Sequence, residues 1–195
     1  MYHGTMTTDV RPALEGAVAE LPRGLRDHVL RVVAETRRLA ERHGVDEARA
    51  VVAALGHDLL RAHRPAELLR QAEAASLALS DIERANPILL HGALGAHLLA
   101  ERFGVDDAEV LAAARNHTTA RAGMSVLERL IYVADKIEPE KARSDPALAE
   151  ARLLADESLE AAMRRLLDWH VSRAVEKGWP LHPDTVAARN ELLER

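Results

Sequence analysis

A histidine and an aspartate stand side by side in an otherwise apolar stretch, and this pair is the first place where chemistry could occur. The pair is His57 and Asp58, within AALGHDLL. The residues around it are those of a buried helix, where an unpaired carboxylate is strongly destabilising. A bound divalent cation would compensate for this burial. An arginine or a backbone partner would do the same, so the pair alone leaves a metal site and a structural role equally open.

Other histidines and aspartates in apolar surroundings extend the pattern. His28 lies on the preceding expected helix, His91 opens a helix in ILLHGALGAHLL, and His117 ends one in AAARNHTT. Asp135 lies inside LIYVADKI, where a core residue is expected. Each histidine taken singly is more often a core or surface residue. Taken together, four histidines and two aspartates without cysteine suit Fe, Mn, Mg, Co or Zn. Such a set exceeds what one tetrahedral ion needs and suits two ions, with Asp58 bridging them.

Four motifs in this order and spacing carry a resemblance to a known family. They are HDLLR, LLHGALGA, NHTTARAGMS and YVADKIEP. The order H…HD…D is the signature of the HD superfamily of metal-dependent phosphohydrolases. The four motifs together resemble the bacterial HD-domain enzymes that cleave diadenosine tetraphosphate symmetrically into two ADP. The resemblance covers residues 25–145.

The resemblance implies a centre of two divalent or mixed-valence transition-metal ions. Iron is the expected metal, and manganese, cobalt, magnesium and zinc are alternatives. The implied ligands are His28, His57, Asp58, His91, His117 and Asp135. Two such ions would activate a water molecule to hydroxide and neutralise phosphate oxygens during attack on an inner phosphorus.

The resemblance also implies which side chains lie beside the phosphates: Arg61, Thr118, Thr119, Arg121 and Lys136. Asp58, Arg121 and Lys136 are the expected catalytic residues, the two cations stabilising charge on the leaving side. From the residues alone, each of these cations could equally be a solvated surface charge. Two positions depart from the family pattern: Ala120 replaces a common glycine, and Lys141 replaces an arginine. A lysine keeps the charge but loses bidentate phosphate geometry.

The elements that must position these residues are expected to be helices throughout. No segment alternates with a period of two for long enough to form a strand. Caps and prolines predict helices from an Asp9 cap to Leu21, from about Leu25 to Gly44, from Asp46 to about His63, from Pro65, from Pro87 to Gly104, from Asp106 or Asp107 to Asn116, near Ser125–Ile137, and from Pro146 onwards. A polar loop is expected at residues 118–123, and a break from Pro139 to Asp145.

The predicted fold is all-α, a single HD-domain helical bundle with a C-terminal helical extension. Residues 1–24 form an N-terminal segment with a short helix, residues 25–145 the HD domain, and residues 146–195 an extension packed on the same domain. Aromatic residues make up only 3% of the chain, so the core must be built from alanine, leucine and valine. Such a composition favours closely packed helices.

Bulk properties narrow the classes of partner. The absence of cysteine excludes disulfides and thiolate metal sites, and the net charge of −5 argues against a general nucleic-acid binder. No apolar run is long enough for a membrane span, and the N-terminus lacks the pattern of a secretory signal. We therefore expect a cytoplasmic protein whose partner is a small nucleotide rather than nucleic acid or a membrane. A homodimer stays open.

Two other functions remain compatible with the sequence. One is an HD enzyme acting on another phosphoester, such as a nucleoside monophosphate or a cyclic nucleotide. The other is a module that binds a nucleotide in its HD site without turnover. His97 lies about 240° round the helix from His91, so the two cannot both face one metal centre on a regular helix. Cap or surface roles are expected for four other histidines: His43, His63, His170 and His182. Trp169 and Trp179 are expected to be packing residues rather than base-stacking ones.

Overall fold

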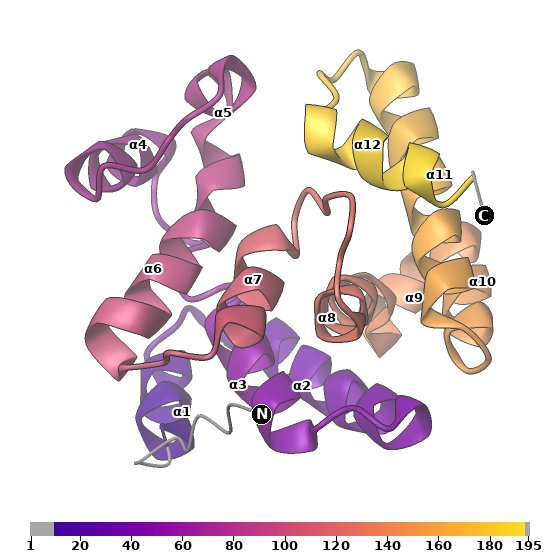
Figure 1. Cartoon of the computed structure of the whole chain (residues 1–195), viewed down its shortest axis with the longest axis horizontal. Helices are drawn as coiled ribbons and strands as arrows, with labels where there is room; N and C mark the ends of the chain where they lie inside the picture. Colours follow the sequence, from indigo (N-terminus) through magenta and orange to yellow (C-terminus); the bar gives the residue numbers. More distant parts are fainter. Residues whose placement is uncertain (1–9, 194–195) are drawn as a thin grey trace.

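The computed structural model describes residues 10–193, and every regular element in this range is a helix (Figure 1). The elements are α1 (Arg11–Ala19), α2 (Arg23–His43), α3 (Glu47–Gly56), α4 (Pro65–Ala74), α5 (Asp81–Ala85), the 3-10 helix η1 (Pro87–Leu90), α6 (His91–Phe103), α7 (Ala108–Asn116), α8 (Val126–Ile137), α9 (Pro139–Ser144), α10 (Pro146–Ala155), α11 (Leu159–Lys177) and α12 (Pro183–Glu191). The all-α prediction is confirmed. Across the same range, no helix has both the length and the apolar character needed to cross a bilayer.

Several helix ends lie where the capping residues predicted them. α2 ends at Gly44, which has a left-handed φ of 64°. Asp46 and Asp107 cap α3 and α7 by accepting hydrogen bonds from backbone N–H groups. Ser125 caps α8 in the same way. The cap predicted at Asp9 lies outside the described residues. Local capping chemistry therefore delimits the helices that carry the candidate ligands.

The prediction that α3 continues to about His63 is wrong, because the helix ends at Gly56. The Nδ1 atom of His57 donates to the Ala54 carbonyl oxygen at 2.7 Å. In a continued helix, that oxygen would accept from the N–H of Asp58. The residues that follow form tight turns instead. The His–Asp pair thus lies at the end of a helix and not in its middle.

Two short helices appear where the sequence predicted none. The break expected after Ile137 contains α9, which begins at Pro139 because proline suits the first turn of a helix. The side chain of Glu138 caps α9 by accepting from the N–H of Glu140 at 2.9 Å. Earlier in the chain, Ser80 caps the short helix α5. Both corrections arise from caps that the periodicity of apolar residues does not reveal.

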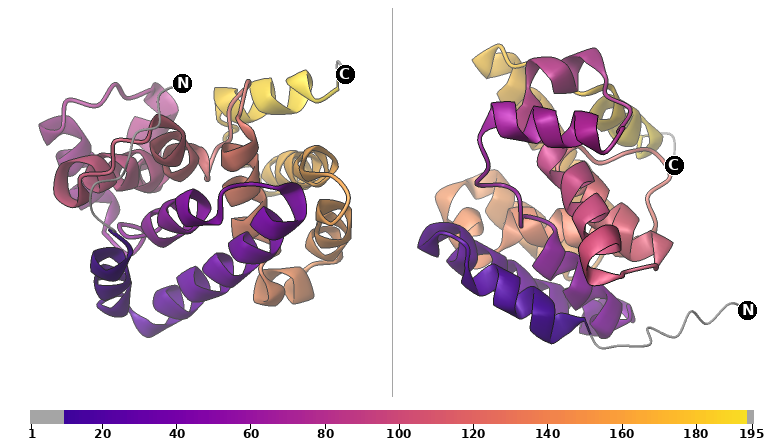
Figure 2. Two further views of the ribbon diagram at one scale, coloured as in Figure 1. Left: turned by 60° about the horizontal axis from the view of Figure 1, so that its bottom comes forward. Right: turned by 90° about the vertical axis from the view of Figure 1, so that its left-hand side faces the viewer.

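One hydrophobic core runs through most of the chain. Leu14 of α1, Ile131 of α8 and Leu166 of α11 are all fully buried in it. In Figure 2 the orange and yellow C-terminal helices lie against the same body as the indigo and purple N-terminal ones. This core contains residues from both sides of positions 24 and 145. The domain boundaries predicted at these two positions stay predictions. A smaller cluster joins α4, η1 and α6: Leu68, Ala72, Leu90 and Leu94.

Candidate metal centre

The side chains predicted as metal ligands meet where α2, α3, α6, α7 and α8 converge. All of them are buried, each at most 9% exposed. They come from α2, from the turn after α3, from the first residue of α6, from the residue after α7 and from α8: His28, His57 and Asp58, His91, His117, and Asp135. The ring centroids of His57 and His117 lie 4.8 Å apart, and those of His91 and His117 lie 4.9 Å apart. The structure thus gathers residues that are up to 107 positions apart in sequence.

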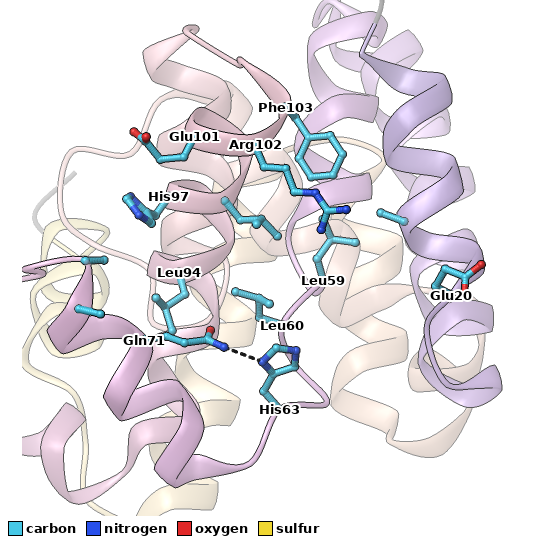
Figure 3. Close-up of a pocket in the computed structure, with 14 residues that line it drawn as sticks. Glu20, Leu59, Leu60, His63, Gln71, Leu94, His97, Glu101, Arg102 and Phe103 are labelled. Carbon is cyan, nitrogen blue, oxygen red and sulfur yellow. Dashed lines mark hydrogen bonds between the residues drawn. The ribbon is translucent and has the colours of Figure 1, made fainter.

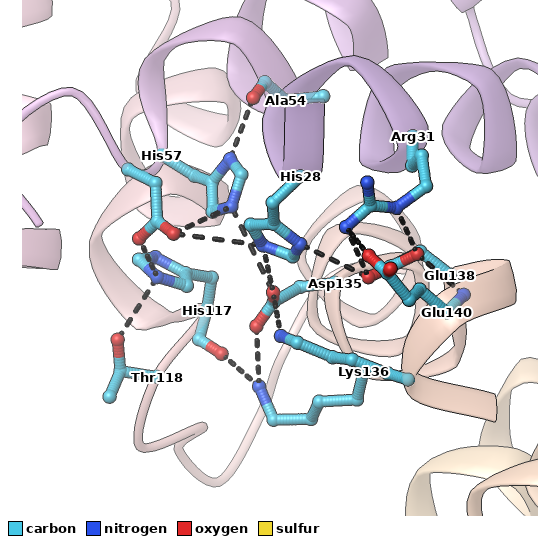
Figure 4. A network of polar contacts seen from close by, with 12 residues as sticks. His28, Arg31, Ala54, His57, His117, Thr118, Asp135, Lys136, Glu138 and Glu140 are labelled. Carbon is cyan, nitrogen blue, oxygen red and sulfur yellow. Dashed lines mark hydrogen bonds and ion pairs between the residues drawn. The ribbon is translucent and has the colours of Figure 1, made fainter. Parts of the chain in front are cut away.

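Hydrogen bonds to the backbone fix the tautomer of three of these histidines. In each, Nδ1 contacts the carbonyl oxygen three residues earlier, as Figure 4 shows for His57 and Ala54. The pairs are His57 with Ala54 at 2.7 Å, His91 with Ile88 at 2.5 Å, and His117 with Ala114 at 2.7 Å. A carbonyl oxygen can only accept, so each Nδ1 carries the proton. Each Nε2 of a neutral ring therefore presents a lone pair to the cluster.

These lone pairs point toward the ionised carboxylate of Asp58, which likewise has no proton to donate in a hydrogen bond. The Nε2 atom of His91 lies 3.1 Å from Asp58 Oδ1 and 3.0 Å from the Nε2 atom of His117. The Nε2 atom of His117 is 3.4 Å from the same carboxylate oxygen. The Thr118 hydroxyl can donate to only one of these two rings. The buried Nε2 atom of His57 has no hydrogen-bond partner within the described chain. Such a set of acceptors fits a cation, which would accept all of the lone pairs.

The donor atoms fall into two sets that share Asp58. One set is His28, His57 and Asp58, and the other is Asp58, His91 and His117. Within each set the ligand atoms lie within 4.8 Å of one another. The Asp58 Oδ2 atom is 3.5 Å from His57 Nε2 and 3.7 Å from His28 Nε2, whereas Oδ1 faces the other set. The two oxygens of one carboxylate thus face different sets, as a bridging ligand requires.

The pKa values of four side chains in the cluster are shifted toward the forms that bind a metal. Burial lowers the pKa of His57 to about 4 and also lowers the pKa of His117. Burial alone would raise the pKa of Asp58, but the neighbouring histidines, His57 first among them, hold it well below its usual range. Burial is likewise outweighed at Asp135, where Lys141 is the largest of the influences that lower the pKa. Neutral imidazoles and ionised carboxylates bind a cation without first releasing a proton.

Comparison with known proteins identifies the family of the chain. The sequence model of the HD domain family matches residues 25–140. This chain belongs to the HD domain family. The symmetrical bis(5'-nucleosyl)-tetraphosphatase of Bacillus subtilis is 37% identical to the HD chain over 166 residues, covering 85% of it and 88% of the relative. The protein of the same name from Halalkalibacterium halodurans is 35% identical, covering 85% and 87%.

A solved structure from the same family shares the fold. It is a predicted HD superfamily hydrolase involved in NAD metabolism, from Clostridium acetobutylicum. It superposes on the HD chain with a TM-score of 0.90 at 33% identity, covering 95% of this chain and 97% of the other. The resemblance inferred from the four sequence motifs is therefore confirmed over nearly the whole chain, including the helices beyond residue 145.

A buried glutamate, Glu138, contacts the Nδ1 atom of His28, and the sequence did not predict this contact. Glu138 Oε1 lies 3.3 Å from His28 Nδ1, and Arg31 Nε donates to Glu138 Oε2 at 2.7 Å (Figure 4). Glu138 is only 1% exposed. A carboxylate in this position orients a ligand imidazole and makes it more basic. The only signal in the sequence is its place directly before Pro139, where a helix cap with a second role could be sought.

Replacing Glu138 with glutamine is expected to weaken metal binding about 10- to 100-fold, because the neutral amide cannot orient and polarise the His28 ring as the carboxylate does. Metal titration of chelator-treated protein would measure the change. Glu140→Gln is the matched control, since Glu140 also pairs with Arg31 but is largely exposed and has no contact with His28. Equal losses in the two variants would show that Arg31, and not the imidazole, carries the effect.

Gly92 allows α6 to pass against the end of α7. A Cβ atom at this position would lie 2.6 Å from the Arg115 carbonyl oxygen, 3.2 Å from that of Ala114 and 3.3 Å from His117 Nδ1. The two nearest atoms belong to the backbone, which cannot rotate away. Gly92 therefore sets the distance between the helices that carry His91 and His117.

The Gly92→Ala variant is expected to lose about 1–3 kcal/mol of unfolding free energy, because the added methyl group overpacks this contact. It should also bind metal more weakly, since the end of α7 must move. Thermal melts and metal titration would measure both effects. Gly16→Ala in α1 is the control, because a Cβ atom added there would have no neighbour within 4 Å. That change should be neutral or stabilise the protein by about 0.5–1 kcal/mol. Unchanged stability in Gly92→Ala would contradict the close packing.

A cavity of about 540 Å³ opens onto the cluster of candidate metal ligands. Three of the predicted phosphate-binding residues line it: Arg61, Thr118 and Lys136. Lys141, the residue that replaces the family arginine, lines it too. Its lining also includes Ile88 and Leu89 of η1 and four residues from the C-terminal part of the chain: Leu148, Trp169, His170 and Trp179. No motif or spacing in the sequence points to these C-terminal residues as part of the site.

The basic side chains at this cavity are held in different ways. Lys136 Nζ donates to the His117 carbonyl oxygen at 2.6 Å and to Asp135 Oδ2 at 3.1 Å. Lys141 Nζ donates to Asp135 Oδ1 at 2.7 Å. The Arg61 side chain, by contrast, is exposed and makes no hydrogen bond or ion pair with the described residues. Its guanidinium is therefore free to bind an anion in the cavity.

The other two predicted phosphate-binding residues, Thr119 and Arg121, do not line this cavity. Arg121 donates from Nε and Nη2 to the two carboxylate oxygens of buried Glu128, at 2.8 Å and 2.7 Å. The Thr119 carbonyl oxygen accepts from the Thr185 hydroxyl at 2.7 Å. Ala120 has a φ of 60°, which explains why glycine is common there. Roles for Thr119 and Arg121 at the phosphates stay predictions.

A larger cavity of about 700 Å³ lies away from the cluster (Figure 3). Its walls are mainly apolar, with His63, His97, Glu101 and Arg102 among them. His63 contacts the Gln71 side-chain amide at 3.2 Å. Among the described residues, no group that could hold a metal lies in this cavity. The smaller cavity is therefore the candidate active site, because candidate metal ligands line it and not the larger one. His97 lies outside the candidate metal centre, as expected.

Proposed function

We propose that this HD protein hydrolyses dinucleoside tetraphosphates, such as diadenosine tetraphosphate, symmetrically into two ADP. The observation that carries the proposal is the pair of donor sets sharing Asp58, next to a cavity lined by Arg61, Lys136 and Lys141. The names of the Bacillus and Halalkalibacterium relatives support the same substrate class. A cytoplasmic location remains a further prediction, and a homodimer stays open.

We infer that two transition-metal ions, with iron as the first candidate, belong to this centre. The residues that would hold them are His28, His57, Asp58, His91, His117 and Asp135. When bound, such ions activate water at neutral pH and neutralise the oxygens of the attacked phosphate. The all-histidine and carboxylate donor set, with no cysteine, supports iron or manganese over a thiolate-bound metal.

The side chains of the HD chain position the substrate around this centre. Lys136 is partly buried beside the cluster and brings a positive charge to the cavity, where charge develops on the leaving phosphate. Arg61 has no competing partner among residues 10–193 and can bind a phosphate further along the chain of four. The Thr118 hydroxyl lies at the boundary between cluster and cavity and can donate to a phosphate oxygen. Arg121 would reach the substrate only after leaving Glu128.

The experiment that tests this function is product analysis. Purified protein of measured metal content is incubated with diadenosine tetraphosphate, a nucleoside monophosphate and a cyclic nucleotide, and the products are separated by chromatography. We expect ADP as the only nucleotide product of the tetraphosphate, because attack falls between its second and third phosphates. AMP together with ATP would refute symmetrical cleavage. Binding without any turnover would indicate a nucleotide-binding module.

A further inference from the structure

Both tryptophans of the chain, Trp169 and Trp179, line the cavity that opens onto the metal centre. Trp169 lies on α11, and Trp179 directly follows the glycine that ends this helix. Neither is part of the HD ligand set or of the phosphate-binding residues. The C-terminal extension thus contributes an aromatic wall, formed by Trp169 and Trp179, to a cavity that four of the candidate metal ligands also line: Asp58, His91, His117 and Asp135.

A hydrogen bond and packing against the core fix the orientation of the Trp169 side chain. Its indole N–H donates to Asp145 Oδ2 at 2.8 Å, while the ring packs partly against the core. Asp145 is itself held in place, because its other oxygen accepts from the Ala147 N–H at 2.8 Å and caps α10. Trp169 therefore forms a rigid part of the cavity wall.

Trp179 is not explained by packing, since it is 56% exposed. The packing role expected for it from the sequence is wrong. Its backbone N–H donates to the Ala174 carbonyl oxygen at 2.9 Å, which holds the residue at the end of α11. The Arg173 guanidinium carbon lies 5.6 Å from the Trp169 ring centroid and 6.0 Å from that of Trp179. This cation joins the two rings while an indole surface remains open.

We propose that the aromatic wall, supported by Arg173, is the nucleobase-binding subsite of this cavity. A purine has a flat π face that stacks on an indole, whereas its phosphates need cations. The cavity offers both, because Arg61, Lys136 and four of the candidate metal ligands also line it. A nucleotide stacked on Trp179 would direct its phosphates toward them. The inference rests on the proposed function, since it identifies where one base of the dinucleotide binds.

The chain reports on this subsite through its own fluorescence, because both of its tryptophans line the cavity. ADP and pyrophosphate are titrated separately into the metal-loaded protein. We expect ADP to quench the tryptophan emission and pyrophosphate to change it much less. In Trp179→Ala, with Trp169 as the remaining reporter and calorimetry as a second measurement, the affinity for ADP should fall about tenfold while that for pyrophosphate is retained. Trp179→Tyr, which keeps an aromatic face, should restore most of the loss.

Val175→Ala is the matched control, because Val175 is an exposed apolar residue of the same helix that does not line the cavity. Its affinity for ADP should equal that of the wild type. Equal losses for ADP and pyrophosphate in Trp179→Ala, or no loss for ADP, would overturn the proposal. ADP-specific quenching in a protein that fails to cleave diadenosine tetraphosphate would retain the base subsite and reject the proposed reaction. Cleavage with an unchanged KM in Trp179→Ala would do the reverse.

Discussion

The Asp58→Asn variant is expected to lose both metal and hydrolysis, because one side chain serves both donor sets. An amide presents one oxygen and no charge, so it cannot bridge two cations. Bound metal should fall from about two ions per chain to less than about one half, and kcat by a thousandfold or more. Elemental analysis and initial rates would measure these effects. Asp46→Asn is the control, since asparagine caps a helix as well as aspartate.

The melting temperature of metal-free Asp58→Asn tests whether Asp58 is a metal ligand or a structural residue. In chelator-treated protein at pH 8, the Asp58 carboxylate faces lone pairs on His91 and His117. An asparagine NH2 group can donate to them, so the metal-free variant should melt at the same temperature as the metal-free wild type or higher. Each kcal/mol corresponds to about 2–4 °C at this chain length. A clear fall in melting temperature would show that Asp58 serves mainly the fold.

The gathering of the candidate ligands was predictable, because charged and polar side chains stand among apolar residues in the sequence. Asp135 stands in LIYVADKI and Asp58 in AALGHDLL, where the flanking residues require burial. A buried carboxylate needs a partner, and histidines at the ends of neighbouring helices supply a common one. The order of the helices followed from caps such as Asp107 and Ser125. These signals are local, so one sequence suffices to read them.

Contacts between distant segments could not be read in this way. Nothing near Glu138 indicates that it lies behind His28, a residue 110 positions earlier. The pairing of Arg121 with Glu128 was likewise hidden, because both residues look like solvated charges. Trp179 resembles a packing residue in sequence, and only the arrangement of α11 against the HD helices places it at the cavity. Such features depend on tertiary packing, for which periodicity and capping carry no information.

The Arg61→Ala variant is expected to discriminate between substrates. The Arg61 side chain lines the cavity without a partner among the described residues, so a bound polyphosphate can pair with it. A charge-assisted hydrogen bond contributes about 1.5–3 kcal/mol, and Arg61 is exposed, which favours the lower end. We therefore expect kcat/KM for diadenosine tetraphosphate to fall about tenfold. The rate with a small generic phosphoester should change much less, because that substrate reaches only the metal centre.

Variants of two other arginines test whether the loss expected in Arg61→Ala arises from a contact in the cavity. Arg64→Ala removes a charge three residues further on that does not line the cavity, and it should leave both substrates unaffected. In Arg121→Ala the outcome depends on Glu128. If Arg121 stays paired with Glu128, its loss lowers stability and affects both substrates alike. If it leaves Glu128 to bind the polyphosphate, as the family resemblance implies, only the hydrolysis of the tetraphosphate slows. Equal losses on both substrates in Arg61→Ala would remove Arg61 from the polyphosphate site, because a phosphate contact beyond the metal centre cannot act on a substrate with only one phosphate.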